Sequence, residues 1–138
     1  MSLPRWLLRL FPRLAPQGRW GDAVRVTDPV ALARLSRCYA ETVAWCRAKG
    51  FPIQSPECRV VLRVWPEHLR APEGLGIAQV LAPDVIKGDA HGTMLFKRAW
   101  LGTEWLIRHE SFHAITGDPT HPTTAFNPDG TLKGVLHR

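Results

Sequence analysis

Cysteine is scarce in this chain of 138 residues, and a long apolar run is missing. The three cysteines are an odd number without a Cys-x-x-Cys pair, so the sequence predicts neither a disulfide framework nor a cysteine metal site. Reduced, buried thiols at Cys38, Cys46 and Cys58 are typical of a cytoplasmic protein, which is the expected location. No apolar stretch is long enough to cross a bilayer. Arg9 interrupts the apolar N-terminal stretch and no small-residue cleavage site follows, so we do not expect a secretory signal.

The sequence also lacks a glycine-rich phosphate loop, a Gly-x-Ser-x-Gly elbow and a long run of basic residues. The first two absences argue against nucleotide chemistry and serine hydrolysis. A net charge of +6 and a pI near 9.9 raise nucleic acid as a partner. No basic strand interleaved with aromatic residues accompanies that charge. Solubility or a preference for acidic peptides explains it equally well, and nucleic-acid binding stays an alternative.

The composition, 45% hydrophobic and 22% charged, predicts one globular domain, which we place at residues 21–138. Residues 1–20 form a basic arm in which Arg5, Arg9 and Arg13 recur every four residues among leucines. This amphipathic pattern fits an anionic membrane surface or a groove on a partner. Docking on its own domain or on an oligomeric neighbour is the alternative. Pro12 limits any helix here to about two turns, and nothing specifies the oligomeric state.

Local signals predict an α+β fold: an N-terminal helix, a small mixed sheet and a second helix. Asp28 followed by Pro29 begins the first helix, which should run to Lys49 before Gly50. Strands are expected over residues 59–65, 77–81 and 93–98, where β-branched and apolar residues lie between turns. Val85 and Ile86 are too short a pair to assign. The last helix should begin near Thr103 and end at Gly117.

A His-Glu-x-x-His sequence lies within this last helix, at residues 109–113. Helical positions i and i+4 share a face, so His109 and His113 can bind one metal ion. Glu110 lies about 100° further round, a position that suits a base better than a third ligand. Two histidines and a glutamate in a helix that also carries Trp105, Leu106, Ile107, Phe112 and Ile115 need partners, and metal coordination would satisfy them.

A catalytic zinc site takes three protein ligands and leaves the fourth position to water. Gly117 can turn the chain, and the link 118–120 could return His121 to the metal, so His121 is the predicted third ligand. Asp118 is the alternative ligand, or else an acceptor for a ligand imidazole. His91 and Asp89 are weaker candidates for extra ligands because a solvent-exposed turn accounts for them. Tyr39, an oxyanion donor in principle, has a spacing typical of the core.

The segment 93–126 resembles the zincin metallopeptidases, whose active site is built on an HExxH helix. The nearest comparison within them is with the metzincins, which continue HExxHxxGxxH, whereas this chain has HExxHxxxGxxxH. The resemblance implies Zn²⁺ held by His109, His113 and His121, with Glu110 as the general base. It also implies peptide-bond hydrolysis, with the substrate paired to an edge strand, either residues 93–98 or 77–81.

Two functions are therefore expected from the sequence. The first is a zinc-dependent hydrolase, most simply a peptidase that acts on a peptide or protein substrate. The alternative is a non-enzymatic binding or assembly protein that keeps a structural or vestigial zinc site and is associated with nucleic acid in one version. A closed site with four protein ligands would favour the second, because it leaves no position for water.

Overall fold

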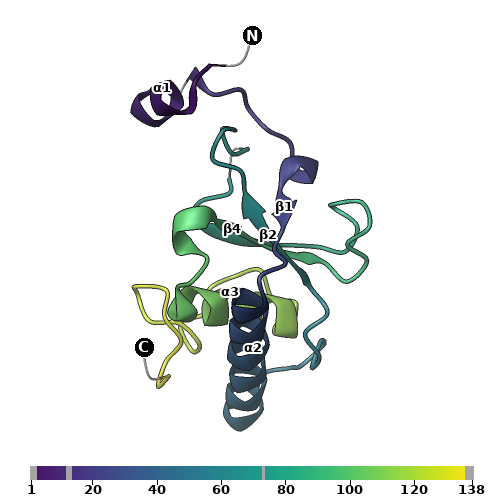
Figure 1. The fold of residues 1–138 in the computed structure, drawn as a ribbon. Coiled ribbons are helices and arrows are strands. Elements are labelled where there is room, and N and C mark those ends of the chain that lie inside the picture. The colour runs from purple at the N-terminus through teal and green to yellow at the C-terminus, as the bar shows by residue number, and fades with distance from the viewer. Residues whose placement is uncertain (1–2, 12–13, 73, 136–138) are drawn as a thin grey trace.

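A computed structural model describes residues 3–11, 14–72 and 74–135 of the chain (Figure 1). Within these ranges, three α-helices and a four-stranded mixed sheet confirm the α+β class. Among these residues no helix has both the length and the apolar content that a membrane span requires. Pro12 and Arg13 of the arm lie outside the described residues. In chain order, the elements are α1 (Arg5–Leu10), η2 (Trp20–Asp22), β1 (Val24–Arg25), α2 (Pro29–Lys49), β2 (Val61–Trp65), β3 (Ala78–Leu81), β4 (Thr93–Lys97), η3 (Arg98–Trp100) and α3 (Glu104–Thr116).

The strands lie in the order β1-β2-β4-β3, with β2 and β4 parallel and the outer pairs antiparallel. β4 is therefore an interior strand, and residues 93–98 cannot present a free edge; β3 lies at the edge instead. The predicted strand limits were too wide. β2 begins two residues later than expected, and Arg98 belongs to η3 rather than to β4. Residues 85–86 form no strand.

Helix α2 has the limits that its sequence predicts. The Asp28 carboxylate accepts a hydrogen bond of 3.2 Å from the backbone N–H of Ala31, and Pro29 occupies the first helical position. Gly50 ends the helix with a φ of 80°, in the left-handed region that glycine adopts without a steric penalty. Local chemistry alone thus determines both ends of the longest element.

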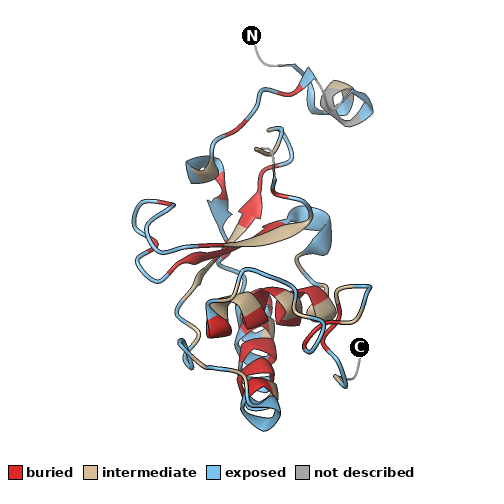
Figure 2. Ribbon diagram, turned by 180° about the vertical axis from the view of Figure 1, so that it is seen from behind, coloured by how far each residue is buried: buried red, intermediate tan, exposed pale blue. Residues whose placement is uncertain are grey.

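Helices α2 and α3 form one layer on one face of the sheet, while α1 lies apart from both (Figures 1 and 2). The core between this layer and the sheet buries residues from both helices, from β2 and from β4, among them Leu35, Leu62, Met94, Phe96 and Ile107. A second cluster joins α2 and α3 to residues 125–132, and it includes Phe112 and Phe126. This second cluster fixes the C-terminal segment against α3, where the histidines lie.

An ion-pair network links the two helices below the sheet. The Arg108 guanidinium, only 4% exposed, donates to Glu41 of α2 at 2.9 Å and to Glu104 at 3.3 Å. Arg37 donates to the same two carboxylates. A buried guanidinium needs such partners, because an unpaired charge in the interior is strongly destabilising. Because Arg108 directly precedes His109, the network also fixes how α3 is rotated about its axis at the histidines.

A buried polar cluster lies on the opposite face of the sheet. Arg63 of β2 donates to both oxygens of Asp89, at 2.8 and 2.9 Å, and Thr93 donates to Asp89 at 2.7 Å. Asp89 is 2% exposed, so its charge depends on these partners. The Arg63 guanidinium holds the pKa of the Asp89 carboxyl below its ordinary value, against the opposing effect of burial.

We expect Asp89→Asn to lower the free energy of unfolding at pH 7 by about 3 kcal/mol, because the largely buried Arg63 guanidinium loses its counter-charge and keeps only the Ala23 carbonyl as a partner. The pKa of Asp89 is lower in the folded state than in the unfolded state. The ionised carboxylate therefore stabilises the fold fully above the unfolded pKa of about 3.9, and this stabilisation is lost as the pH falls through the folded-state pKa. The difference between the wild type and the variant should therefore shrink in acid. Urea titrations at pH 7 and pH 3 measure both effects.

Asp84→Asn is the matched control, since Asp84 is exposed in the same loop and asparagine tolerates its positive φ of 62°. It should change the stability by less than about 0.5 kcal/mol. Equal losses in the two variants would contradict the assignment of a stabilising ion pair to Asp89.

Candidate metal centre

The HExxH residues lie near the middle of α3, a helix buried on most of its surface. Leu106, Ile107, Phe112 and Ile115 are each at most 3% exposed. Gly117 ends the helix with a φ of 72°, and a side chain there would collide with Gln54, so the turn requires glycine. The chain then returns along α3 and brings residues 118–133 beside His109 and His113.

Backbone carbonyls orient both imidazoles of α3. His109 Nδ1 lies 2.6 Å from the carbonyl oxygen of Gly130, and His113 Nδ1 lies 2.7 Å from that of Asp118. A carbonyl oxygen only accepts hydrogen bonds, so each Nδ1 must carry the proton. In a neutral imidazole the other nitrogen, Nε2, then carries a lone pair. Backbone carbonyls commonly fix metal-binding histidines in this way.

The Nε2 atoms of His109, His113 and His121 converge on one point. The separations are 3.0 Å between His109 and His121, 3.2 Å between His113 and His121, and 3.2 Å between His109 and His113. Three imidazole nitrogens around a tetrahedral zinc, at about 2.0–2.1 Å from it, would be about 3.3 Å apart. The three side chains could therefore hold a metal ion with little movement.

A cation would relieve the contact between His109 and His113. Both Nε2 atoms are acceptors in the tautomers that the carbonyls impose, so two lone pairs face each other at 3.2 Å with no proton between them. Burial lowers the pKa of His109 to about 4 and also lowers that of His113, so protonation at neutral pH does not relieve the contact. His121 can donate to only one of them. A divalent ion satisfies all three.

Two Asp-x-Thr turns supply the two orienting carbonyls. In the first, Asp118 accepts hydrogen bonds from the N–H and the hydroxyl of Thr120 at 2.8 and 2.7 Å. In the second, Asp129 accepts from the N–H and the hydroxyl of Thr131 at 3.0 and 2.6 Å. The first turn begins at the carbonyl that holds His113, and the second encloses the Gly130 carbonyl that holds His109. Each turn therefore fixes one imidazole.

Phe126 forms the base of the centre. Its ring lies against all three imidazoles, with centroid separations of 4.6 Å to His109, 5.6 Å to His113 and 5.3 Å to His121. The residue is 5% exposed and also packs edge-on against Phe112. An apolar base excludes water from one side of the histidines, so their open side is the one that faces the surface.

Glu110 lies beside the histidines on α3 and is 5% exposed. Its carboxylate accepts a hydrogen bond from the backbone N–H of Val80 on β3. Burial raises the pKa of Glu110 to about 7, although this hydrogen bond opposes the shift. A cation bound by the neighbouring histidines would lower the pKa again. A carboxyl group with a pKa near neutrality is suited to take and return a proton.

The centre opens into a cleft of about 900 Å³ between β3 and the loop 54–60. Glu110, His113 and His121 line it. A smaller hollow of about 620 Å³ lies on the side of the C-terminal segment and is lined by His109, His121 and residues 126–130. His121 borders both, so the three-histidine centre lies where the two hollows meet. Small molecules or an extended chain have access to it from the surface.

The other sequence candidates have different positions. The Asp118 carboxylate bonds to Thr120 and is not part of the metal-binding group; its backbone carbonyl, rather than its side chain, contacts a ligand imidazole. Asp89 is paired with Arg63 on the other face of the sheet and lies outside the three-histidine group. The Tyr39 hydroxyl donates to the Ser55 carbonyl at 2.7 Å in the core, as its spacing predicted.

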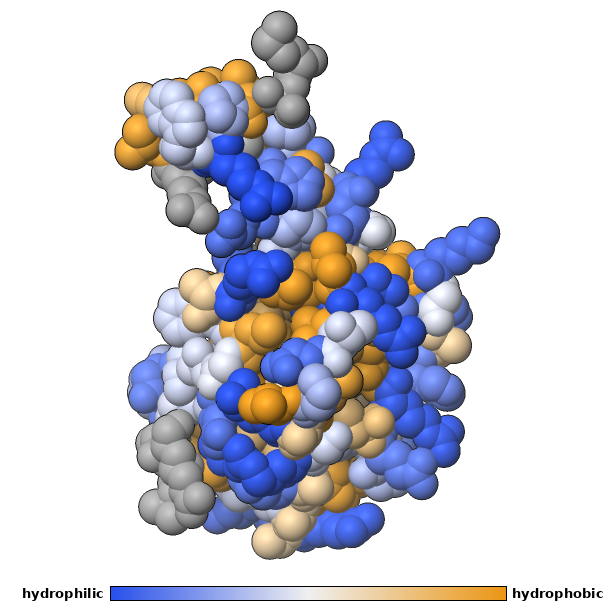
Figure 3. All heavy atoms as spheres, in the orientation of Figure 1, coloured by the Kyte–Doolittle hydropathy of each residue, from blue (hydrophilic) through white to orange (hydrophobic). Residues whose placement is uncertain are grey.

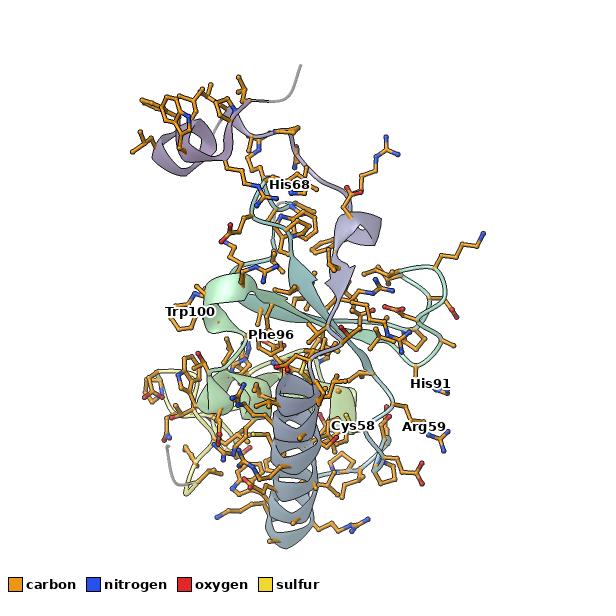
Figure 4. The ribbon with its side chains drawn as sticks, in the orientation of Figure 1. Cys58, Arg59, His68, His91, Phe96 and Trp100 are labelled. Atoms are coloured by element: carbon orange, nitrogen blue, oxygen red, sulfur yellow. The ribbon has the colours of Figure 1, made fainter. Side chains whose placement is uncertain are left out.

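His91 lies at the rim of the cleft, outside the three-histidine group. Figure 4 shows its side chain directed outward on the same side of the molecule as Arg59. Sequence reasoning missed Gly130 and Phe126. The Asn-Pro-Asp-Gly sequence at residues 127–130 is typical of a turn, but nothing local indicates that the Gly130 carbonyl meets His109. Within the described residues, no fourth histidine, cysteine or carboxylate joins the group.

Comparison of the chain with protein-family models, with curated proteins and with solved structures finds no match.

We expect the purified protein to bind about one zinc ion per chain and His121→Ala to weaken binding at least 100-fold, because only two donors remain. His91→Ala is the matched control, an exposed histidine on the same cleft that should leave zinc affinity unchanged. Competition with a chromophoric chelator measures both. Equal affinity in the wild type and His121→Ala would exclude His121 as a ligand.

Thr131→Val should weaken zinc binding by about 10–100-fold, the usual effect of removing a group that orients a metal ligand. The change removes the hydroxyl that donates to Asp129 and loosens the turn that carries the Gly130 carbonyl. Thr124→Val, at an exposed threonine of the same segment, is the control. If the two variants bind zinc alike, the second Asp-x-Thr turn does not position His109.

Proposed function

We propose that this protein is a zinc-dependent hydrolase and that its substrates are peptides or proteins. One observation carries the proposal: the imposed tautomers turn the lone pairs of His109 and His113 onto one point, and a buried glutamate with a pKa near 7 lies beside it. Metal ligands and a base from a single helix are the combination that hydrolysis by activated water requires. The resemblance to zincins supports the same assignment.

The residues present divide the chemistry between them. When bound, zinc would act as a Lewis acid that brings the pKa of a water ligand to about 7 and polarises a carbonyl. Glu110 would accept the proton of the attacking water and then transfer it to the leaving amine. The Val80 backbone interacts with the Glu110 carboxylate and lowers its pKa against the effect of burial, which favours the ionised form that accepts the proton.

The substrate class follows from the edge of the sheet. Lys97 donates to the Ile77 carbonyl at 3.0 Å, so Ile77 and Lys97 form a hydrogen-bonded antiparallel pair. In an antiparallel pair, hydrogen-bonded residues alternate with residues whose backbone groups point away from the partner strand. The N–H and C=O groups of Ala78 and Val80 therefore point away from β4. The Val80 N–H meets Glu110 on this side, and both residues line the cleft. An extended peptide could add to the rest of this edge above the histidines, pairing with Ala78 and with the Val80 carbonyl.

A purely structural zinc site is the alternative function. Structural sites are closed by four protein ligands, whereas catalytic sites have three and an open position. The group found here has three histidines, one of them exposed, and borders two hollows. These features favour the catalytic assignment.

Glu110→Gln should retain zinc and lose peptidase turnover by a factor of about 10²–10⁴, because the amide cannot accept the proton. The zinc-loaded protein is incubated with unstructured casein and with a mixed peptide library, and mass spectrometry identifies newly formed termini. Metal content is measured on the same samples.

Glu57→Gln is the control for this experiment, the same substitution at an exposed glutamate that lines the same cleft. It should leave the rate within about twofold. Turnover by Glu110→Gln equal to that of the wild type would exclude Glu110 as the base. Tightly bound zinc without cleavage of any substrate would favour the structural alternative.

A further inference from the structure

The N-terminal arm carries exposed apolar side chains that its own domain does not cover. In and beside α1, Trp6 is 64% exposed, Leu10 67%, Phe11 54% and Leu14 51%. Trp6 and Leu10 lie four positions apart on one face of the helix. Figure 3 shows the apolar residues of α1 gathered at one end of the molecule. Isolated exposed apolar residues are common, but a group of four within nine positions marks an interaction site.

The chain leaves the domain from a fixed point just after this group. The N–H of Gly18 donates to the Arg70 carbonyl at 2.8 Å, and the N–H of Arg70 donates to the Pro16 carbonyl at 2.8 Å. A Cβ at Gly18 would lie 2.5 Å from the ring of Trp65, so the backbone is packed directly on that ring. The anchored residues, 16–18, follow the apolar group in the sequence and do not include any of its four members. Residues 15–18 of the arm therefore dock on its own domain, whereas the four apolar side chains that precede them do not.

The charge of the arm restricts the partner. Residues 1–20 contain four arginines, Arg5, Arg9, Arg13 and Arg19, and neither aspartate nor glutamate. A second copy would bring an equally basic arm and a further net charge of +6, so electrostatic repulsion disfavours pairing of two arms. Nucleic acid would neutralise the arginines and could stack bases on the aromatic rings, but it would leave the aliphatic side chains of Leu10 and Leu14 in water. The partner must be both anionic and apolar.

We propose that this arm binds an anionic lipid surface. Arginines among tryptophan, leucine and phenylalanine are the composition of helices that lie in the interface of a bilayer, with the apolar side chains in the acyl boundary and the cations at the headgroups. Tryptophan in particular concentrates at this depth. A groove on a protein would need apolar anchors over about eight helical positions, and α1 has six residues. A lipid surface imposes no such length.

Binding through the arm would leave the candidate metal centre accessible. α1 lies beyond one end of the sheet, whereas α3 packs against the face that α2 shares (Figure 1). His68, exposed in the loop that anchors the arm, lies at the same end of the molecule as α1 (Figure 4). The inference stands on the arm alone and does not depend on hydrolase activity.

The test uses the full chain and sedimentation with two kinds of vesicle, phosphatidylcholine alone and a mixture with one third phosphatidylglycerol. We expect binding to the anionic vesicles that weakens as salt is added, and little binding to the neutral ones. Arg5→Gln with Arg9→Gln should weaken binding roughly 25-fold, since each cation near such a surface contributes about 1 kcal/mol. Trp6→Ser with Leu10→Ser should also reduce it.

Val30→Ser is the control, because Val30 is as exposed as Trp6 but lies on α2. It should bind the vesicles as the wild type does. Equal binding to neutral and anionic vesicles, or no effect of the arm variants, would overturn the proposal. Self-association abolished by Trp6→Ser would identify a second copy as the partner instead, and binding to an acidic polymer but not to vesicles would indicate a protein or nucleic acid.

Discussion

The hydrogen bonds from His109 and His113 to two backbone carbonyls are the constraint on which the rest of the site depends. Each bond places the proton of one imidazole on Nδ1 and leaves a lone pair on Nε2. The helix then turns both lone pairs toward the same point. Without a cation, the folded protein must hold two acceptors in contact, and the free energy for this comes from the packing of Phe112, Phe126 and their neighbours.

The same helix carries a buried cation and a buried carboxyl group, and each fixes α3 to a different neighbour. Arg108 is paired with Glu41 and therefore with α2. Glu110 is hydrogen-bonded to Val80 and therefore to β3. Because either group would be costly to bury without its partner, α3 cannot rotate or slide without losing one of them. The position of the histidines is thus determined by polar contacts on both sides of the helix as well as by apolar packing.

Much of the fold could be predicted because its signals are local. Asp28, Pro29 and Gly50 define α2 by chemistry within four residues, and Gly117 does the same for the end of α3. The order of the strands depends on pairing between residues far apart in sequence, which periodicity does not encode. Hence the sequence left open which strand lies at the edge, and one of its two candidates was wrong. For His121, the sequence showed only that the link 118–120 is long enough to return the side chain to the helix.

Of the two residues that sequence reasoning missed, Phe126 acts through its ring, whereas Gly130 acts through its backbone carbonyl. Gly130 contributes a carbonyl, and so does Asp118, whose carboxylate was the feature that drew notice. A backbone group has no residue type to recognise, so only the turn that presents it can be read from sequence. Here that turn is Asp-x-Thr, and it occurs at 118–120 and again at 129–131. The pair is informative because each copy holds a different imidazole of one helix. A search for metal centres that pairs an HExxH helix with such turns would use the orienting groups as well as the ligands.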